Sequence, residues 1–323
     1  MKTNGAMLKT LEKYGIDHYS SLHFGNQKNP LLKITEGATS FALKEKPFHM
    51  SDAELLSMIS LQNKLNELLL PCPIVKTTIG GKLFVSEHER TFYLQEWIPG
   101  CALPEQIDRK LVGGFIAHIR EIMLQINVHE YHLSHKTHYP SFKQMDLLHL
   151  KKIFYNKNIN AHLTEKMFST YHPITCRICI SSLKYELVHG DFHPENIIFD
   201  NDRFALIDFE AMHYAFPHQD LASMLIWDTM WVVENNHYEA KHIDSLRFAD
   251  ILKGYSSHIY VSKDDIDLIY ALLCILSIYS VANAFNFFYN KACVKDCAEY
   301  SIALLLKNLV EAKIILYDEY HNF

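Results

Sequence analysis

The sequence predicts an α+β fold with a small, β-rich N-terminal lobe and a larger, helical C-terminal lobe. Three observations support this prediction. Up to residue 100, short apolar segments with strand-like alternation dominate, and one helical segment interrupts them. Beyond residue 100, apolar residues recur at helical spacing over long segments. The chain has 323 residues, which is enough for two lobes that each bury a core.

The N-terminal lobe is predicted from its alternating residues and its turns. Phe41–Lys44 alternates between two faces, which indicates a strand. Ser51 is a typical N-cap for a helix that we expect to continue to about Leu68, and Pro71 lies just beyond its end. Further strands are predicted to end near Thr78 and to cover residues 82–85 and 91–97.

The C-terminal lobe is predicted from amphipathic and apolar helices. Residues 105–130 carry apolar side chains at helical spacing. Later helices are predicted over residues 220–233, 245–254, 264–289 and 298–316. The uncharged stretch 268–288 contains recurring Ser and Asn residues, so we interpret it as a buried helix and not as a membrane span. We therefore expect an N-terminal lobe over 1–95, a hinge over 96–100 and a helical lobe over 101–323, with a ligand site where the lobes meet.

Composition excludes several classes of protein. The formal net charge of −6 argues against a nucleic-acid-binding protein. Seven cysteines, an odd number in a long chain, indicate reduced thiols and a cytoplasmic location. Cys176 and Cys179 form one isolated C-x-x-C pair, which we interpret as structural thiols because a zinc site would need a second pair. No apolar targeting segment is apparent near Met1.

Two polar motifs stand out between residues 187 and 210. The first reads His189-Gly190-Asp191, and Asn196 follows Asp191 after four intervening residues. The second, Ile207-Asp208-Phe209-Glu210, lies after an apolar segment. Phosphoryl transfer needs a carboxylate that orients an acceptor hydroxyl and takes its proton. It also needs oxygen ligands that hold Mg²⁺ against nucleotide phosphates, and an amide with a second carboxylate can provide them.

These two motifs closely resemble the signature of the aminoglycoside phosphotransferase and choline kinase superfamily, which has a protein-kinase-like, bilobal fold. The resemblance implies that Asp191 is the catalytic base and that His189 braces the loop. It implies that Asn196 and Asp208 are ligands of Mg²⁺, and that the nucleotide is ATP, with GTP left open. The resemblance covers residues 20–225, and its most specific part is 187–222.

Two departures from protein kinases are informative. Gly190 stands where protein kinases carry an arginine that binds an activation-loop phosphate. Glu210 stands where they carry the glycine of the Asp-Phe-Gly motif. The chain therefore lacks the residue that makes activity depend on loop phosphorylation, which favours a small-molecule kinase over a protein kinase.

The resemblance also implies a set of nucleotide-binding residues in the N-terminal lobe. Lys44 matches the lysine that holds the α- and β-phosphates, and Glu54 is the candidate for its helix partner, the alternative being a charge that only stabilises the helix start. Asn26 and Asn29 lie where a glycine-rich loop would cover the phosphates. The hinge-like segment implies adenine recognition by backbone groups of Gln95, Glu96 and Trp97. Asp220 is interpreted as a structural brace of the catalytic loop.

The acceptor site is predicted less specifically, in the helical lobe after the second motif. The candidates are Glu210, Trp227, Asp228, Trp231 and Glu234. Trp227 and Trp231 lie one helical turn apart, so with nearby carboxylates they could bind a cationic amine; packing in the core is the alternative.

We therefore expect a monomeric or homodimeric kinase of an aminoglycoside-like or other amine-bearing natural product, with a hydroxyl as acceptor and no nucleic-acid or membrane partner. The alternatives are a metabolic kinase for choline, homoserine or a sugar, and a non-catalytic, kinase-like protein of the spore-coat type.

Overall fold

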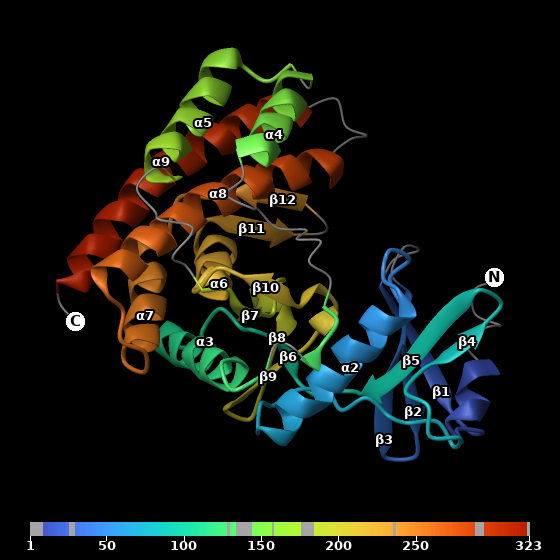
Figure 1. Cartoon of the computed structure of the whole chain (residues 1–323). Coiled ribbons are helices and arrows are strands. Elements are labelled where there is room, and N and C mark those ends of the chain that lie inside the picture. The colour runs from blue at the N-terminus through green and yellow to red at the C-terminus, as the bar shows by residue number, and fades with distance from the viewer. Residues whose placement is uncertain are drawn as a thin grey trace. The chain divides into compact units, whose positions relative to one another are not determined.

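The computed structural model describes residues 9–25, 30–127, 130–133, 144–156, 158–175, 184–234, 237–287 and 294–321. The chain divides into two compact units, whose helices and strands are labelled in Figure 1. The sheet unit contains residues 1–103, 127–134 and 196–212, and the helical unit contains residues 104–126, 135–195 and 213–323. Both units are assembled from separated stretches of the chain. The expected combination of a small β-rich part with a larger helical part is confirmed.

The sheet unit is built on five antiparallel strands in the order β1-β2-β3-β5-β4. These are β1 Ser20–Gly25, β2 Pro30–Glu36, β3 Thr39–Glu45, β4 Val85–Glu87 and β5 Arg90–Glu96. Apolar residues of the strands and of the preceding segment form one core cluster, which comprises Leu11, Ile16, Leu32, Ile34, Phe41, Leu43, Phe92 and Leu94. The predicted strands at 41–44 and 91–97 are therefore confirmed. The predicted strand ending near Thr78 is reduced to a single bridge between Val75 and Gln95.

Helix α2, Asp52–Glu67, begins and ends within one residue of the predicted bounds. Its N-terminus is a capping box, in which the Glu54 N–H donates to Ser51 Oγ and the Ser51 N–H donates to Glu54 Oε2. Its buried face includes Leu55, Ile59 and Leu65, and α2 also contacts the short 3₁₀ helix η4, Phe209–Ala211. A second sheet of this unit has β8 Ile197–Asp200 as its central strand, which pairs with β6 Cys101–Ala102 on one side and β9 Arg203–Leu206 on the other.

The helical unit contains seven described helices and two small antiparallel sheets within its described residues. The helices are α3 Arg109–Met123, α4 Gln144–Asn156, α5 Ala161–Thr175, α6 Gln219–Thr229, α7 Ser245–Ser256, α8 Lys263–Phe287 and α9 Val294–Tyr320. The sheets pair β7 Glu186–Val188 with β10 His213–Ala215, and β11 Trp231–Glu234 with β12 His237–Ala240. Figure 1 shows α8 and α9 side by side, with α3 beside α7.

Helices α3 and α7 approach so closely that glycine is required on both of them. A Cβ atom on Gly113 would lie 2.0 Å from the carbonyl oxygen of Ile251, and one on Gly254 would lie 1.9 Å from that of Lys110. Both distances are far below van der Waals contact, and backbone atoms cannot move aside as a flexible side chain can. This contact fixes α3, which supports the strand that leads into the first polar motif.

Helix α8 is the long apolar helix predicted over 264–289. Residues Lys263–Ala282 are long and apolar enough to cross a membrane, but 83% of that stretch is buried inside the fold. Packing against α6 and α9 explains this composition, since a helix that is apolar all round is a core helix when other elements cover it.

The predicted helix over 220–233 is wrong in its last turn. Helix α6 ends at Thr229, and Trp231–Glu234 instead forms a hairpin with β12. The aromatic and β-branched run Trp231-Val232-Val233 favours a strand, which the helical spacing of the preceding apolar residues concealed. As a consequence, Trp227 and Trp231 do not share a helix face.

Candidate active site

The first motif lies in the helical unit, directly after strand β7. The two carboxylate oxygens of Asp220, in the first turn of α6, accept the N–H groups of His189 at 2.8 Å and of Gly190 at 3.1 Å. Gly190 has a φ of +84°, a conformation that glycine adopts without steric cost. The Asp220 brace therefore has the structural role predicted for it.

Asp191 has an accessible carboxylate in this loop. Its side chain is 38% exposed, and His193 Nε2 lies 3.6 Å from its Oδ2 atom. The neighbouring His189 is fully buried, with its ring edge-on to Phe192 at a centroid distance of 5.8 Å. Burial raises the pKa of Asp220 to about 7, although the two backbone N–H groups oppose this shift. The accessible Asp191 carboxylate thus lies in a loop whose backbone is held by the buried Asp220 carboxylate of α6.

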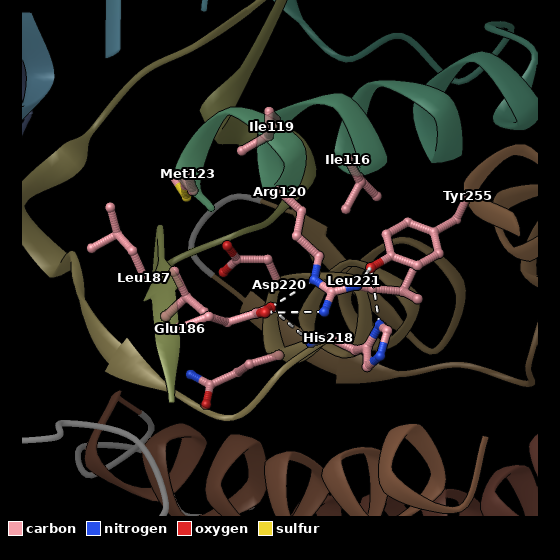
Figure 2. A pocket seen from close by; sticks show the side chains of 12 residues that line it. Ile116, Ile119, Arg120, Met123, Glu186, Leu187, His218, Asp220, Leu221 and Tyr255 are labelled. Carbon is pink, nitrogen blue, oxygen red and sulfur yellow. Dashed lines mark hydrogen bonds and ion pairs between the residues drawn. The ribbon is translucent and has the colours of Figure 1, made fainter. Parts of the chain in front are cut away.

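A buried polar network anchors the strand that precedes the loop (Figure 2). Arg120 on α3 donates two hydrogen bonds to Glu186 on β7, at 2.7 and 3.0 Å, and a third to the Tyr255 hydroxyl at 3.2 Å. The same hydroxyl bonds His218 Nδ1 at 2.9 Å, and His218 Nε2 bonds Asp265 at 2.9 Å. Figure 2 shows Arg120, Glu186, His218 and Tyr255 close to Asp220. The network therefore ties β7 to α3, α7 and α8.

The second motif lies in the sheet unit, together with Asn196. Strands β8 and β9 pair antiparallel, and the Ile207 N–H donates to the Asn196 carbonyl at 3.0 Å. This pairing brings Asn196 and Asp208 to the same end of the hairpin. Asp208 has a left-handed backbone (φ +67°), which is uncommon for a residue other than glycine and marks a position worth functional attention. Its side chain is 40% exposed and can accept a ligand.

Lys44 joins the second motif within the same unit. Its Nζ lies 2.9 Å from Asp208 Oδ1 and 2.6 Å from Glu210 Oε1. The hydroxyl of Tyr93 donates to the same Glu210 oxygen at 2.6 Å. Burial disfavours the charge of Lys44, but the two carboxylates outweigh burial and hold the lysine pKa well above its usual value. A permanently charged ammonium thus sits beside Asp208.

Asn196 and Asp208 suit a magnesium ion by their chemistry. Both offer oxygen ligands, which hard divalent cations prefer, and Mg²⁺ in phosphoryl-transfer sites is usually held by one or two protein groups plus phosphates. Their common position at the end of the β8–β9 hairpin fits this use. The adjacent Lys44 would then supply a positive charge for a phosphate.

Glu54 does not pair with Lys44 as expected. Its carboxylate accepts the backbone N–H and the hydroxyl of Ser51, at 2.7 and 2.8 Å, and so completes the capping box of α2. The carboxylates paired with Lys44 are those of Asp208 and Glu210. The helix-start alternative considered for Glu54 therefore describes the structure.

The hinge-like segment is held firmly inside the sheet unit. Gln95 is buried and accepts a hydrogen bond from Gln62 at 3.2 Å. The backbone N–H of Glu96 donates to Ile74, and that of Trp97 donates to Ser40, both at 3.0 Å. The backbone N–H groups of Glu96 and Trp97 thus bond within the protein, and adenine recognition by backbone groups of this segment stays a prediction. Asn26 and Asn29 lie outside the described residues, as do Cys176 and Cys179.

Asp228 is a structural residue and not an open acceptor site. It is 5% exposed, and its two oxygens accept hydrogen bonds from Arg109 at 2.8 and 2.9 Å. Arg109 also donates to the carbonyls of Pro104 and Ile107. The prediction that Asp228 helps bind a cationic amine is therefore wrong, because its charge is already neutralised by a buried guanidinium.

The remaining acceptor candidates fall in different places. Trp231 is 2% exposed, and its indole N–H finds no hydrogen-bond acceptor among the described residues. Trp227 is half-buried, and the two rings are 5.7 Å apart. Glu210 is bound to Lys44 and Tyr93, and the side chain of Glu234 lies outside the description. Core packing thus accounts for Trp231, the alternative weighed for the tryptophans.

Sequence reasoning did not identify Tyr93, the hydrogen-bond partner of Glu210, or Arg109, the ion-pair partner of Asp228. Tyr93 pairs with Lys44 across β3 and β5, so alternation alone places both side chains on one face. That register was available only once the strand pairing was known. Arg109 and Asp228 are 119 residues apart, and no local pattern links them.

Comparison with known proteins gives a consistent family match. Residues 25–248 match the model of the phosphotransferase enzyme family. Similar solved structures include an amicoumacin kinase in complex with AMP-PNP and Ca²⁺ (15% identity, 96% of both chains covered, TM-score 0.69). They also include a microcompartment-associated aminopropanol kinase (14%, 98% of both chains, TM-score 0.71) and an aminoglycoside phosphotransferase from Alicyclobacillus acidocaldarius (15%, 98% of this chain and 96% of the other, TM-score 0.66). A search of curated proteins found no match.

Proposed function

Because the chain belongs to the phosphotransferase enzyme family, we propose that it uses ATP and Mg²⁺ to phosphorylate a hydroxyl group of an amine-bearing small molecule. Asp191 acts as the catalytic base, which orients the hydroxyl and takes its proton. Asn196 and Asp208 hold Mg²⁺, and Lys44 contacts the phosphates. His189 and Asp220 stabilise the loop that carries Asp191.

One observation carries this proposal. The Lys44 ammonium lies 2.9 Å from Asp208, although the two residues are 164 positions apart in the chain. In phosphoryl-transfer sites a lysine and a metal-binding carboxylate lie close together, because they hold the nucleotide phosphates and their metal ion. If the second motif were only a turn, nothing in its chemistry would require the largely enclosed Lys44 ammonium beside Asp208.

The loop chemistry supports the role of Asp191. A general base must be accessible to its substrate and held in a fixed place. Asp191 is 38% exposed, whereas the backbone immediately before it is fixed by Asp220. When bound, Mg²⁺ would neutralise charge on the nucleotide phosphates, which is the chemistry that a divalent metal supplies in this class of reaction.

Two observations support an amine-bearing acceptor. The similar structures include kinases of aminoglycosides and of aminopropanol, compounds whose names denote an amine beside a hydroxyl. The net charge of −6 is compatible with a cationic substrate. The aminopropanol kinase also keeps a metabolic kinase of a short amino alcohol as the second candidate, alongside an antibiotic kinase.

A substrate panel tests the proposal. ATP consumption would be measured with aminoglycosides, short amino alcohols, choline, homoserine and simple sugars, and the product would be identified as a phosphate ester by ³¹P NMR. We expect turnover with at least one amine-bearing alcohol. Turnover confined to neutral sugars would refute an amine-bearing acceptor. Absence of turnover across the whole panel would favour a non-catalytic protein.

A matched pair of variants tests the base. Asp191→Ala should lower kcat by about 10² to 10⁴-fold, which is the usual contribution of a general base, while AMP-PNP still binds. The exposed Asp200, at the end of β8, provides the control, and Asp200→Ala should keep wild-type turnover. Equal activity of both variants would remove Asp191 from the mechanism.

A further inference from the structure

Glu210 belongs to the second motif and contacts two side chains of the five-stranded sheet. It lies on the short η4 helix, two residues after Asp208, and its side chain points back to the sheet. Lys44 and Tyr93 lie directly opposite each other on β3 and β5. The Lys44 ammonium and the Tyr93 hydroxyl each lie 2.6 Å from one and the same oxygen, Glu210 Oε1. Two side chains of the sheet therefore converge on one carboxylate.

Exposure separates the two carboxylates that Lys44 contacts. The side chain of Asp208 is 40% exposed, whereas those of Glu210 and Lys44 are 19% and 15% exposed. When Asp208 binds Mg²⁺, the metal charge offsets the negative charge of the carboxylate and weakens its attraction for Lys44. Glu210, the more enclosed carboxylate, would keep its contact with Lys44 at that stage. The lysine therefore needs a partner that does not share the metal, and Glu210 has the geometry for it.

The helix glutamate that was expected to pair with Lys44 makes other contacts. Glu54, on helix α2, accepts hydrogen bonds from the backbone and side chain of Ser51. The η4 helix that carries Glu210 is fixed in its place, because Phe209 is 2% exposed and its carbonyl accepts the Met212 N–H at 3.1 Å. Glu210 thus contacts Lys44 from a short helix that begins directly after the metal-binding carboxylate of Asp208.

We propose that Glu210 is the positioning residue of Lys44, in place of a helix glutamate, and that the Tyr93 hydroxyl fixes the Glu210 carboxylate. This inference rests on the proposed function, since it concerns how Lys44 is presented to a nucleotide phosphate. It moves Glu210 from the acceptor site, where the sequence suggested it, to the nucleotide site. It also makes nucleotide affinity independent of the Glu54 side chain.

A double-mutant cycle on nucleotide affinity provides the test. The dissociation constant of AMP-PNP with Mg²⁺ would be measured by titration calorimetry for the wild type, Glu210→Gln, Lys44→Met and the double variant. We expect Glu210→Gln to weaken binding about tenfold, in line with the usual strength of a hydrogen bond to a charged group. In the Lys44→Met background, Glu210→Gln should change affinity less than about twofold. Equal weakening in both backgrounds would overturn the inference.

Two further arms separate the alternatives. ADP binding in EDTA should be weakened less by Glu210→Gln, because Asp208 still pairs with Lys44 when no metal is bound. If a higher Mg²⁺ concentration restored the AMP-PNP affinity of Glu210→Gln to the wild-type value, Glu210 would be a metal ligand and the positioning role would be refuted. Glu54→Gln tests the helix alternative, and a loss of affinity equal to that of Glu210→Gln would also refute it. The surface variant Glu67→Gln, on the same helix and paired with Lys64, is the matched control.

The remaining arms protect the test against misfolding and against failure of the proposed function. If Glu210→Gln does not fold, Tyr93→Phe removes only the hydroxyl, and it should weaken binding in the wild type but not in the Lys44→Met background. Kinetics should show a rise in the KM for ATP that exceeds the fall in kcat. Failure of the wild type to bind any nucleotide would overturn the proposed function and this inference with it. Wild-type binding that Glu210→Gln leaves unchanged would overturn this inference alone.

Discussion

The buried ion pair between Arg109 and Asp228 gives the sharpest prediction about stability. Both side chains are 4% exposed, and the guanidinium donates to both carboxylate oxygens. Removing one partner of such a pair leaves a buried charge without compensation, which typically costs about 3–5 kcal/mol. Asp228→Asn keeps one acceptor oxygen for the Arg109 guanidinium. We therefore expect the lower end of that range, about 3 kcal/mol.

Thermal unfolding gives this energy a measurable size. One kcal/mol shifts the Tm by about 2–4 °C in domains of 150–250 residues, so Asp228→Asn should lower the Tm by about 6–12 °C. Arg109→Met should lower it further, because this guanidinium also satisfies the carbonyls of Pro104 and Ile107. Differential scanning calorimetry of both variants would measure these shifts.

A matched substitution in the same unit provides the control. Asp250 on α7 faces Lys110 at 3.9 Å, and the lysine side chain is 55% exposed. Exposed pairs are worth about 0–1 kcal/mol, so Asp250→Asn should shift the Tm by no more than about 4 °C. The KM for the acceptor should be unchanged in Asp228→Asn well below its Tm. A wild-type Tm together with a raised acceptor KM would refute the structural role and restore the substrate role.

Two further predictions concern packing and pH. Gly113→Ala should destabilise the protein by about 3 kcal/mol in urea unfolding, the upper end of the usual cost of overpacking, because its Cβ would meet the Ile251 carbonyl. Gly80→Ala, with no atom closer than 3.9 Å, should cost far less, and equal costs would contradict the α3–α7 contact. Burial alone would raise the pKa of Asp265, but hydrogen bonds from His218 and Ser262 outweigh it and hold that pKa below its usual range. This carboxylate therefore stabilises the fold above about pH 4, and the stabilisation is lost as the pH falls. Asp265→Asn should flatten the loss of urea stability below pH 4, while Asp264→Asn, an exposed neighbour, should not, and identical slopes would refute this role.

The sequence predicted those parts of the fold that local signals determine. Ser51 and Pro71 bracket α2 because capping and helix-breaking act over a few residues. The two polar motifs were recognised from residue spacing and from a family resemblance, and the roles of Asp191 and Asp208 stay predictions. The β11 strand was missed because helical spacing and β propensity compete in the segment around Trp231.

The partners of the charged residues could not be predicted in the same way. Lys44 was assigned to Glu54, ten positions away, but its carboxylates come from Asp208 and Glu210, more than 160 positions away. Asp228 looked available for a substrate because Arg109 is distant in sequence. Such pairs depend on tertiary packing, which periodicity and spacing do not encode.

The proposed function requires that Asp208 holds a metal ion for a nucleotide. Titration calorimetry would give the affinity for AMP-PNP with Mg²⁺ and with EDTA, for the wild type and for Asp208→Ala. We expect Mg²⁺ to strengthen binding to the wild type and to have little effect on the variant. Equal dependence on Mg²⁺ in both proteins, or a wild type that ignores the metal, would contradict it.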